Sequence, residues 1–398
     1  MIIDSEVGFQ KIGTTIQESV PYRMFSLTTV VTFLIAIGLI TLSLAVFTLF
    51  DGYAVTFASF VTACYCLYVV NHIRVNHIIV YGLVISFLVI NAAIHVLWLD
   101  GMEFLKSFML TAVMLFVYIT SLVPRDALRK RIDYASALKV ARYAIVGFLL
   151  VQVAEQLFFG STTSWFWLDG ASISNAVDIY RFEAVNALGI FRPVSFFHEP
   201  SYLAAVIFIM LVINDHLFPG GKVRYILIGS IVLTLSALML GVLLAYLAID
   251  LWCRNKALFL VGALMVLVFV LVFPEHVWEF SRLGEIFIEG SSGYIRVVDP
   301  LMHIKAILSK FPFGIPLGQS EVVFDTSLFL IPLYFGLFAP FLILIWVFVI
   351  LQRLGRIKYV VKYFLGVSSL LLVNGSIFTI ESAFLLLILN YAFMPVKK

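Results

Sequence analysis

Arginine, histidine and carboxylate side chains gather in one short stretch of the chain, Phe191-Arg-Pro-Val-Ser-Phe-Phe-His-Glu-Pro-Ser-Tyr-Leu-Ala204, where a polar segment runs into an apolar one. A second polar segment, residues 274–326, carries Arg282, Arg296, His303 and Asp325. Ionisable side chains beside apolar runs of membrane length are functional candidates by default, because they are expensive to keep there. We therefore predict that the two polar segments close over one site.

Arg192 and Arg296 are the strongest candidates for chemistry. A guanidinium group presents a planar fork of donors that fits phosphate oxygens, and it keeps its charge when it is partly desolvated. Two such groups on separate segments can clamp a diphosphate and stabilise the charge that grows as it leaves. The alternative is that each arginine reaches toward lipid phosphates. Arg282 is a weaker third candidate, because Glu279 and Glu285 each lie three residues away and suit helical pairing.

Three further residues are candidates for proton transfer. Glu199 is a possible general base, although backbone N–H groups at a helix start favour the charged form and weaken the base. Orienting Arg192 or a substrate hydroxyl is an equal role for it. Asp325, just before the apolar run at 327–351, is the other candidate base. His198 is an acid, a base or a histidine of the membrane interface.

The substrate-binding candidates differ in their settings; they are His198, Ser201, Arg282, His303 and Glu381. Ser201 belongs to the predicted helix start Glu199-Pro-Ser, since proline is tolerated at the first helical position. Glu381 lies in an apolar run and needs a partner or a water-filled cavity. Glu155, near the outer end of another apolar run and with Gln152 and Gln156 on neighbouring turns, either lines such a cavity or pairs between helices.

The composition is that of a membrane protein. Of the 398 residues, 62% are hydrophobic and 12% are charged, with a mean hydropathy of +1.08. A soluble domain carries roughly 25% charged residues. We predict an all-α polytopic membrane protein with a single transmembrane domain over residues 1–398. The three cysteines give no disulfide framework, and the first 26 residues lack the layout of a cleaved signal peptide.

Apolar runs predict the membrane spans. Clear runs cover 27–49, 53–70, 78–98, 104–123, 143–159, 202–218, 257–273 and 327–351. Two further runs, 225–250 and 363–396, have basic residues at both ends, and basic segments mark the cytoplasmic side. Each of these two runs is therefore predicted to be a hairpin of two short helices, turning near Ser236 and near Asn374-Gly-Ser376. About twelve segments result, with both termini in the cytoplasm.

Residues 160–201 and 274–326 then form two large loops on the outer face. Seven of the 26 Lys and Arg residues face outward, namely Lys106, Arg181, Arg192, Arg282, Arg296, Lys305 and Lys310. Six of these seven lie in the two loops. Ordinary surface solvation is one explanation, and the handling of an anion is the other.

The second loop also predicts a helix of its own. Asp299-Pro300 is a helix start, and Leu301, Ile304, Leu308 and Phe311 recur after it at helical spacing. Such a helix lies on the membrane surface with its apolar stripe down, His303 off that stripe, and ends at Pro312-Phe-Gly314. The chain has no glycine-rich phosphate cradle, CxxC pair or HExxH motif. We expect no metal, no cofactor and no nucleic-acid partner.

Several short motifs occur in the same order as in a known family of proteins. They are Phe-Phe-His-Glu-Pro-Ser at 196–201, Arg282-Leu-Gly-Glu-Ile-Phe-Ile-Glu-Gly-Ser-Ser-Gly-Tyr-Ile-Arg296, Pro312-Phe-Gly-Ile-Pro-Leu-Gly318 and Asn374-Gly-Ser-Ile-Phe-Thr-Ile-Glu-Ser-Ala-Phe384. With them the sequence resembles the Wzy-type polysaccharide polymerases, a branch of the superfamily that includes the O-antigen ligases, and most nearly the colanic-acid polymerases. The resemblance covers roughly the second half of the chain, and the first five spans match only in hydropathy.

The resemblance implies a GT-C-like, metal-independent, inverting glycosyltransferase in the bacterial inner membrane. Such enzymes polymerise undecaprenyl-diphosphate-linked oligosaccharide repeat units, donor and acceptor alike, into an exopolysaccharide, capsule or O-antigen at the periplasmic face. By position, Arg192 and Glu199 match the arginine and the acidic residue of the first large loop. Arg296 matches the arginine of the second. Membrane lipid and a chain-length regulator are the implied partners.

Two alternatives remain open. O-antigen ligases, which move a glycan to a lipid or protein acceptor, carry a histidine just before the span that follows the second loop, where this chain has Asp325-Thr-Ser327. A flippase for the same lipids is expected to show symmetric halves with broken helices at the membrane midplane. The sequence shows no repeat, and its candidate charges lie mostly outside the spans.

Overall fold

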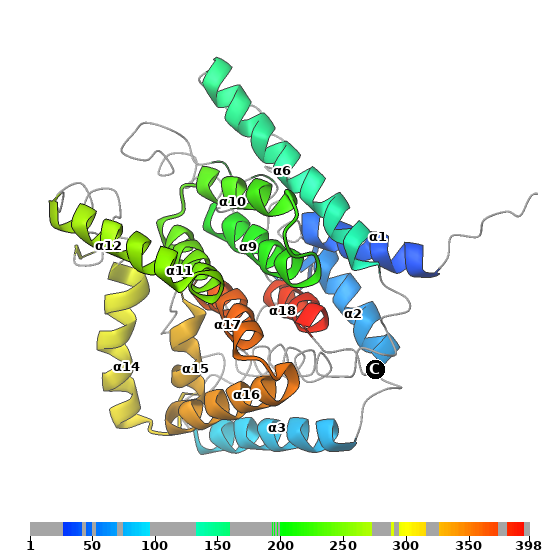
Figure 1. The fold of residues 1–398 in the computed structure, drawn as a ribbon. Helices are drawn as coiled ribbons and strands as arrows, with labels where there is room; N and C mark the ends of the chain where they lie inside the picture. The colour runs from blue at the N-terminus through cyan, green and yellow to red at the C-terminus, as the bar shows by residue number, and fades with distance from the viewer. Residues whose placement is uncertain are drawn as a thin grey trace, which may run out of the picture.

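The computed structural model describes residues 27–41, 45–49, 53–69, 75–95, 133–159, 193, 195, 197, 200–272, 288–289, 294–315, 326–372 and 380–393. Over these residues the fold is helical, as predicted, apart from one two-stranded hairpin (Figure 1). The first half contains α1 (Leu27–Ile40), β1 (Ala45–Leu49), β2 (Tyr53–Thr56), α2 (Phe57–Val69), α3 (Val75–His95) and α6 (Tyr134–Phe159). The second half contains α9 (Pro200–Leu217), α10 (Val223–Leu233), α11 (Ala237–Arg254), α12 (Lys256–Val272), the π-helical turn η4 (Tyr294–Val298), α14 (Asp299–Lys310), α15 (Ser327–Phe335), the 3₁₀ turn η5 (Gly336–Phe338), α16 (Ala339–Leu354), α17 (Ile357–Leu372) and α18 (Ile380–Phe393).

Helix α9 is the centre of the molecule. All of its residues from Pro200 to Asp215 are buried, and it packs against α6, α10, α11, α17 and α18. A helix that is apolar on every side is expected to be covered on every side. In Figure 1, α9 lies between α10 on one side and α17 and α18 on the other, with α11 next to it.

Helices α9 and α18 run in the same direction. The ring of His216 stacks on Phe393 with centroids 4.1 Å apart. One turn earlier in both helices, Val212 and Leu389 meet at Gly366 of α17. Both helices therefore begin at the same end of the bundle, which is the end where the first polar segment enters α9.

The predicted hairpin at 225–250 is confirmed. Helix α10 ends at Leu233 and α11 begins at Ala237, and Leu235 between them has a φ of 51°. Arg224 Nη1, in the first turn of α10, lies 2.9 Å from Asp250 Oδ2 in the last turn of α11. The chain thus returns to the side of the bundle from which it left.

The run at 363–396 also divides into two helices that come back together. Tyr363 Oη, early in α17, donates a hydrogen bond of 2.6 Å to Asn390 Oδ1, late in α18. These two ends can meet only if the helices are antiparallel. The predicted turn at Asn374-Gly-Ser376 lies outside the described residues.

Four predicted runs have different boundaries in the structure. The run 27–49 is not one span, because α1 ends at Ile40 and Ala45–Leu49 pairs antiparallel with Tyr53–Thr56. For the same reason the run 53–70 becomes helical only at Phe57. Valine, threonine and aromatic residues in these strands favour a pleated conformation. Helix α6 begins at Tyr134 rather than at 143, and the run 327–351 is broken by the turn Gly336–Phe338.

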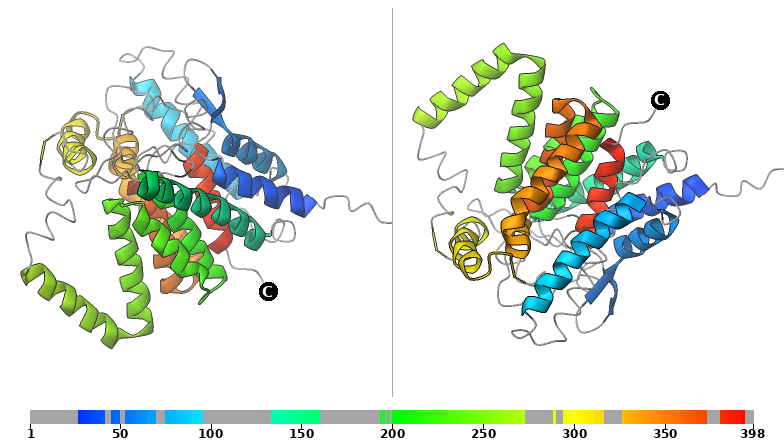
Figure 2. Two further views of the ribbon diagram at one scale, coloured as in Figure 1. Left: turned by 90° about the horizontal axis from the view of Figure 1, so that it is seen from above. Right: turned by 90° about the horizontal axis from the view of Figure 1, so that it is seen from below.

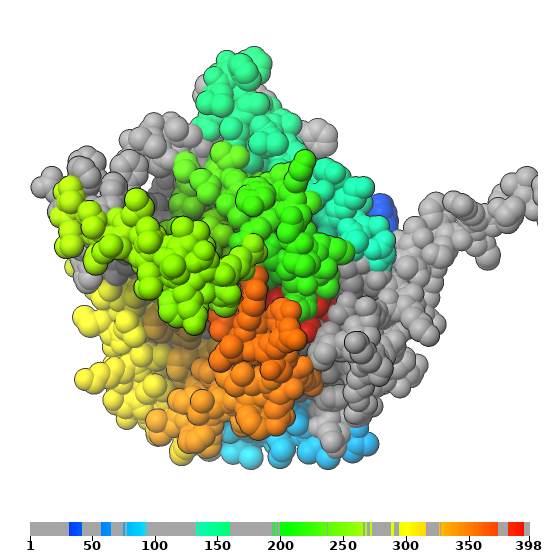
Figure 3. Space-filling view, in the orientation of Figure 1, coloured from blue at the N-terminus to red at the C-terminus, as the bar shows by residue number. Residues whose placement is uncertain are grey.

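Three described helical stretches are long and apolar enough to cross a membrane: Ala135–Phe159, Pro200–Leu217 and Leu328–Leu354. Together with the shorter apolar helices they make a polytopic membrane protein. The predicted span at 104–123 lies outside the described residues, so the count of twelve remains a prediction. Helices α12 and α14 stand at one edge, away from the bundle around α9 (Figures 2 and 3).

Candidate active site

The first polar motif is anchored to α6 by Ser195. The Ser195 N–H donates to Gln152 Oε1 (2.7 Å), Gln152 Nε2 donates to the Ser195 carbonyl (3.4 Å), and Ser195 Oγ donates to the Ile145 carbonyl (2.9 Å). Gln152 and Ser195 are both fully buried. Ser195 has a φ of 53°, a left-handed conformation that a side chain rarely adopts without support. The three hydrogen bonds supply that support, so the role of Gln152 is to position this loop.

In the rest of the motif, buried residues that hold the loop in place alternate with the residues predicted to take part in the reaction. Pro193, Ser195, Phe197 and Pro200 are all buried, and the ring of Phe197 meets Tyr202 edge-on with centroids 5.8 Å apart. The predicted residues Arg192, His198 and Glu199 lie outside the described residues. Their neighbours on either side nevertheless fix where the motif enters the bundle.

Ser201 lies in the first turn of α9, which begins at Pro200 as predicted, and only 2% of its surface is exposed. Glu381 lies in the first turn of α18 and is half-buried. The register of α9 and α18, continued from Val212 and Leu389 back to the helix starts, places Glu381 about level with Ala204. Ser201 and Glu381 are therefore at the same end of the bundle.

Arg296 lies on the π-helical turn η4 and is half-buried. Its carbonyl accepts a hydrogen bond of 3.0 Å from Thr326 Oγ1, directly before α15. Asp325 lies outside the described residues, but it is the chain neighbour of Thr326. The structure thus brings the second predicted arginine to the segment that carries one of the two candidate bases.

The second loop is fastened to α15 by backbone contacts. The Ile315 N–H donates to the Leu333 carbonyl and the Leu337 N–H donates to the Pro312 carbonyl, each at 2.9 Å. Gly314 has a φ of 89° and Gly336 a φ of 51°. A Cβ on either glycine would overlap backbone atoms of the opposite segment. The close approach requires glycine on both sides, which explains why Pro312-Phe-Gly314 faces a helix break.

The predicted helix is confirmed as α14, which starts at Asp299 and ends before Phe311. Ile307 and Phe311 pack against the core, whereas Leu301 is 53% exposed. That the apolar stripe faces the membrane surface remains a prediction. His303 is exposed, and its Nδ1 lies 3.1 Å from Asp299 Oδ1 in the same helix. His303 is thus on the polar face, as predicted. Arg282 lies outside the described residues.

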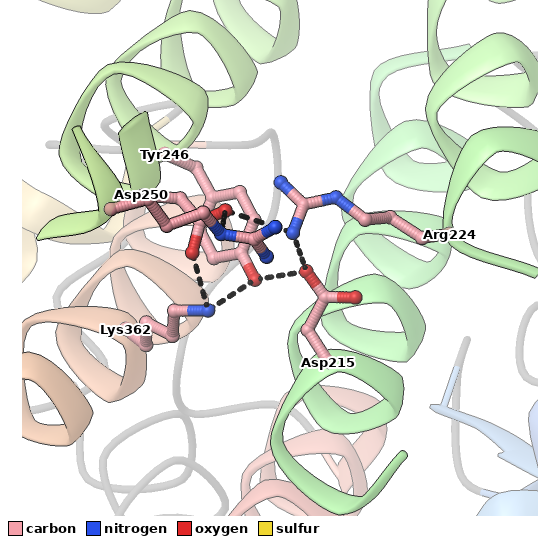
Figure 4. A network of polar contacts seen from close by, with 6 residues as sticks. Asp215, Arg224, Tyr246, Asp250 and Lys362 are labelled. Carbon is pink, nitrogen blue, oxygen red and sulfur yellow. Dashed lines mark hydrogen bonds and ion pairs between the residues drawn. The ribbon is translucent and has the colours of Figure 1, made fainter. Parts of the chain in front are cut away.

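A buried charge network occupies the opposite end of the bundle (Figure 4). Asp215 Oδ2 accepts from Arg224 Nη1 (2.9 Å) and from Tyr246 Oη (2.7 Å). Asp250 pairs with Arg224 at 2.9 Å and with Lys362 at 3.2 Å. These four charged side chains are at most 10% exposed. The network ties α9, α10, α11 and α17 together beside the basic turns.

This network was not predicted from the sequence. The sequence did contain a sign of it, because Asp215 and Asp250 each lie near the end of an apolar run, next to a basic segment. Paired charges of this kind are a common solution for ionisable residues at a helix end within a membrane. Its two carboxylates pair with two buried cations, Arg224 and Lys362, and Asp250 also pairs with the exposed Arg254. The paired charges give the network a structural role.

No group of three or more metal-ligating side chains occurs among the described residues. The predicted site residues that the structure describes are Ser201, Arg296, His303 and Glu381. The fold defines a polytopic helical membrane protein, in which the first polar segment is bonded to α6 and the second to α15.

A model of the WcaD colanic acid polymerase family matches residues 30–394, and the chain belongs to that family. This confirms the resemblance to the Wzy-type polymerases. The chain is 26% identical over 336 residues to a protein of Escherichia coli (strain K12) named "Putative colanic acid polymerase", covering 73% of this chain and 80% of that protein. No solved structure matches the chain.

Proposed function

We propose that the protein joins oligosaccharide repeat units carried on undecaprenyl diphosphate into an exopolysaccharide, at the periplasmic face of the bacterial inner membrane. The observation that carries this proposal is membership of the colanic acid polymerase family over residues 30–394, a range that includes both polar loops and the helices that hold them.

In the proposed reaction, Arg192 and Arg296 grip the diphosphate of the donor. Asp325 or Glu199 takes the proton of the attacking hydroxyl at the end of the acceptor repeat unit. The hydroxyl oxygen forms a bond to the anomeric carbon, while the bond from that carbon to the diphosphate oxygen breaks and its electron pair leaves with the diphosphate. Direct displacement of this kind inverts the anomeric centre and uses no metal. The two guanidinium groups stabilise the charge that develops on the leaving group.

The contacts of the second loop support Arg296 in this role. Its turn is half-buried, bonded to Thr326 and followed by the docked segment Pro312–Ile315. An arginine held on such a support is preorganised, and preorganised donors stabilise developing charge without reorganising during the reaction. Asp325, one residue from Thr326, then shares that support with Arg296.

The first loop supplies the remaining groups. Ser195 is fixed to Gln152 three residues after Arg192 and four residues before Glu199, so that a rigid point lies between the two. We propose that His198, Ser201, Arg282, His303 and Glu381 contact the glycan or its lipid carrier. We further propose that the chain crosses the membrane about twelve times, with both termini in the cytoplasm. A chain-length regulator is the proposed protein partner.

The lipid-linked pool of a strain that lacks the gene tests this function against its alternatives. Loss of a polymerase leaves single lipid-linked repeat units at the outer face of the membrane. Long polymers that remain unattached would indicate a ligase instead. Single repeat units trapped at the inner face would indicate a flippase. Only the first result agrees with the proposal.

A further inference from the structure

A pocket of about 250 Å³ lies between α6, α9 and α10, at the end of the bundle opposite the candidate active site. Its walls are mostly apolar and include Met210 of α9 and Leu227 of α10. Ligand pockets for whole small molecules usually measure roughly 300–1,000 Å³. This pocket is slightly smaller, so its size suits a headgroup rather than a whole lipid.

Asn214 lines the pocket and is 9% exposed. Among the described residues, none provides a hydrogen-bond acceptor for its side-chain nitrogen. Buried amide groups are almost always hydrogen-bonded, since leaving one unsatisfied costs free energy. Within the described part of the chain this nitrogen has no oxygen acceptor, and a ligand in the pocket would supply one.

Two cationic side chains line the same pocket. Lys139 and Arg142, one helical turn apart on α6, both line it, and the guanidinium of Arg142 lies 4.6 Å from the centre of the Tyr143 ring. Gly221 and Val223, where α10 begins, also line the pocket, and a helix start favours a negative charge.

No acidic residue is present among the described side chains that line the pocket. The nearest carboxylate along α9, Asp215, is engaged by Arg224 and Tyr246 in the buried network. The pocket is therefore positively charged, with one amide donor and apolar walls, at the end of the bundle where the basic segments gather.

We propose that this pocket binds the phosphate of an anionic phospholipid headgroup from the cytoplasmic leaflet, with the start of the acyl chains against Met210 and Leu227. Lys139 and Arg142 pair with the phosphate and Asn214 donates to one of its oxygens. A headgroup with an ammonium group fits less well, because the described lining has no carboxylate to receive it. This proposal concerns a site outside the proposed catalytic machinery and does not rest on it.

The test is thermal unfolding of the purified full-length protein in detergent, titrated with phosphatidylglycerol, phosphatidylcholine or inorganic phosphate. Ligand binding to the folded state raises the unfolding temperature. We expect saturable stabilisation by phosphatidylglycerol, with midpoint concentrations at least about tenfold higher for phosphatidylcholine and for inorganic phosphate. The ammonium group of phosphatidylcholine offsets one charge-assisted contact, and inorganic phosphate lacks the acyl contacts with Met210 and Leu227. Equal midpoint concentrations for inorganic phosphate and phosphatidylglycerol would contradict lipid binding and would assign the site to free phosphate.

Two variants locate the effect. Lys139→Gln/Arg142→Gln should raise the phosphatidylglycerol midpoint at least about tenfold, whereas Lys256→Gln/Arg356→Gln, which removes two exposed cations elsewhere, should not. Asn214→Leu replaces the unsatisfied amide with an apolar group of similar size. It should unfold no earlier than wild type without lipid and lose the stabilisation by lipid. Unchanged midpoints in both pocket variants would refute the site.

Discussion

Arg296 and Arg192 contribute a fork of donors rather than a simple positive charge in the proposed mechanism. A lysine keeps the charge but loses the planar pair of N–H groups that grips two oxygens of a diphosphate. Removing one preorganised donor typically lowers the rate by on the order of 10²–10³. We therefore expect Arg192→Lys and Arg296→Lys each to give a folded, membrane-inserted protein whose repeat-unit polymerisation is reduced by about that factor.

Arg181→Lys is the matched control, because Arg181 lies in the first polar loop but outside the motif. It should polymerise at nearly the wild-type rate. If Arg192→Lys and Arg296→Lys also turn over repeat units at the wild-type rate, the two arginines only contact lipid headgroups. The reacting groups would then have to be sought around Asp325 and Glu381.

At the scale of elements, the contact between the second loop and α15 depends on two glycines. Gly336→Ala puts a Cβ into the carbonyl oxygen of Pro312, at a backbone φ of 51° that a side chain disfavours. We expect this variant to undock the segment Pro312–Ile315, lower the unfolding temperature and greatly reduce polymerisation. Gly229→Ala, where nothing lies within 4 Å of the added Cβ, should leave both measurements unchanged. Wild-type activity in Gly336→Ala would show that the position of the segment Pro312–Ile315 is not needed for polymerisation.

The buried network joins four helices at the other end. Lys362→Met removes the buried cation that pairs with Asp250 Oδ1, and removing one partner of a buried pair costs about 3–5 kcal/mol. Its unfolding temperature in detergent should fall by several degrees. Adding Asp250→Asn removes the buried charge that Lys362 paired with and should recover part of the loss.

Arg254→Ala is the control for the network, since the side chain of Arg254 pairs with Asp250 but is 55% exposed. Exposed ion pairs contribute little to stability, so this variant should unfold close to the wild-type temperature. An additive effect of Lys362→Met and Asp250→Asn would mean that the two residues are not coupled.

At the scale of the whole molecule, the hairpins determine which side of the membrane each basic turn faces. In a variant without Cys64, Cys66 and Cys253, single cysteines placed at Lys222, Lys256, Lys358 and Lys398 should all be protected from an impermeant thiol reagent added outside the cell membrane. The reason is that Arg224 and Asp250 hold both ends of the α10–α11 hairpin at one side of the bundle. Labelling at Lys256 without labelling at Lys222 would contradict this topology.

The sequence predicted the features that follow from charge and helix chemistry. Basic residues at both ends of the runs 225–250 and 363–396 required the chain to turn back, and the pairs Arg224–Asp250 and Tyr363–Asn390 show that it does. The proline helix starts at Pro200 and Pro300 were predicted because proline suits the first helical turn. The family was recognisable from the order of short polar motifs.

Features that depend on long-range contacts could not be predicted. Hydropathy alone does not reveal the contact of Gln152 with Ser195, which joins positions in two separate segments. The approach of Gly314 to Gly336 and the pairing of Asp215 with Arg224 depend in the same way on packing. The strands Ala45–Leu49 and Tyr53–Thr56 were read as helical because their residues are as apolar as those of a span.

The most direct test of the proposed function is polymerisation by the purified protein alone. The protein in lipid vesicles would receive repeat units of defined composition on undecaprenyl diphosphate, with excess EDTA, and the products would be separated by length. We predict a ladder of lipid-linked polymers that forms equally well with and without EDTA. Single repeat units left unjoined by an intact, folded protein would contradict the polymerase. A ladder lost to EDTA and restored by a divalent ion would contradict the arginine clamp, since the ion would then bind the diphosphate.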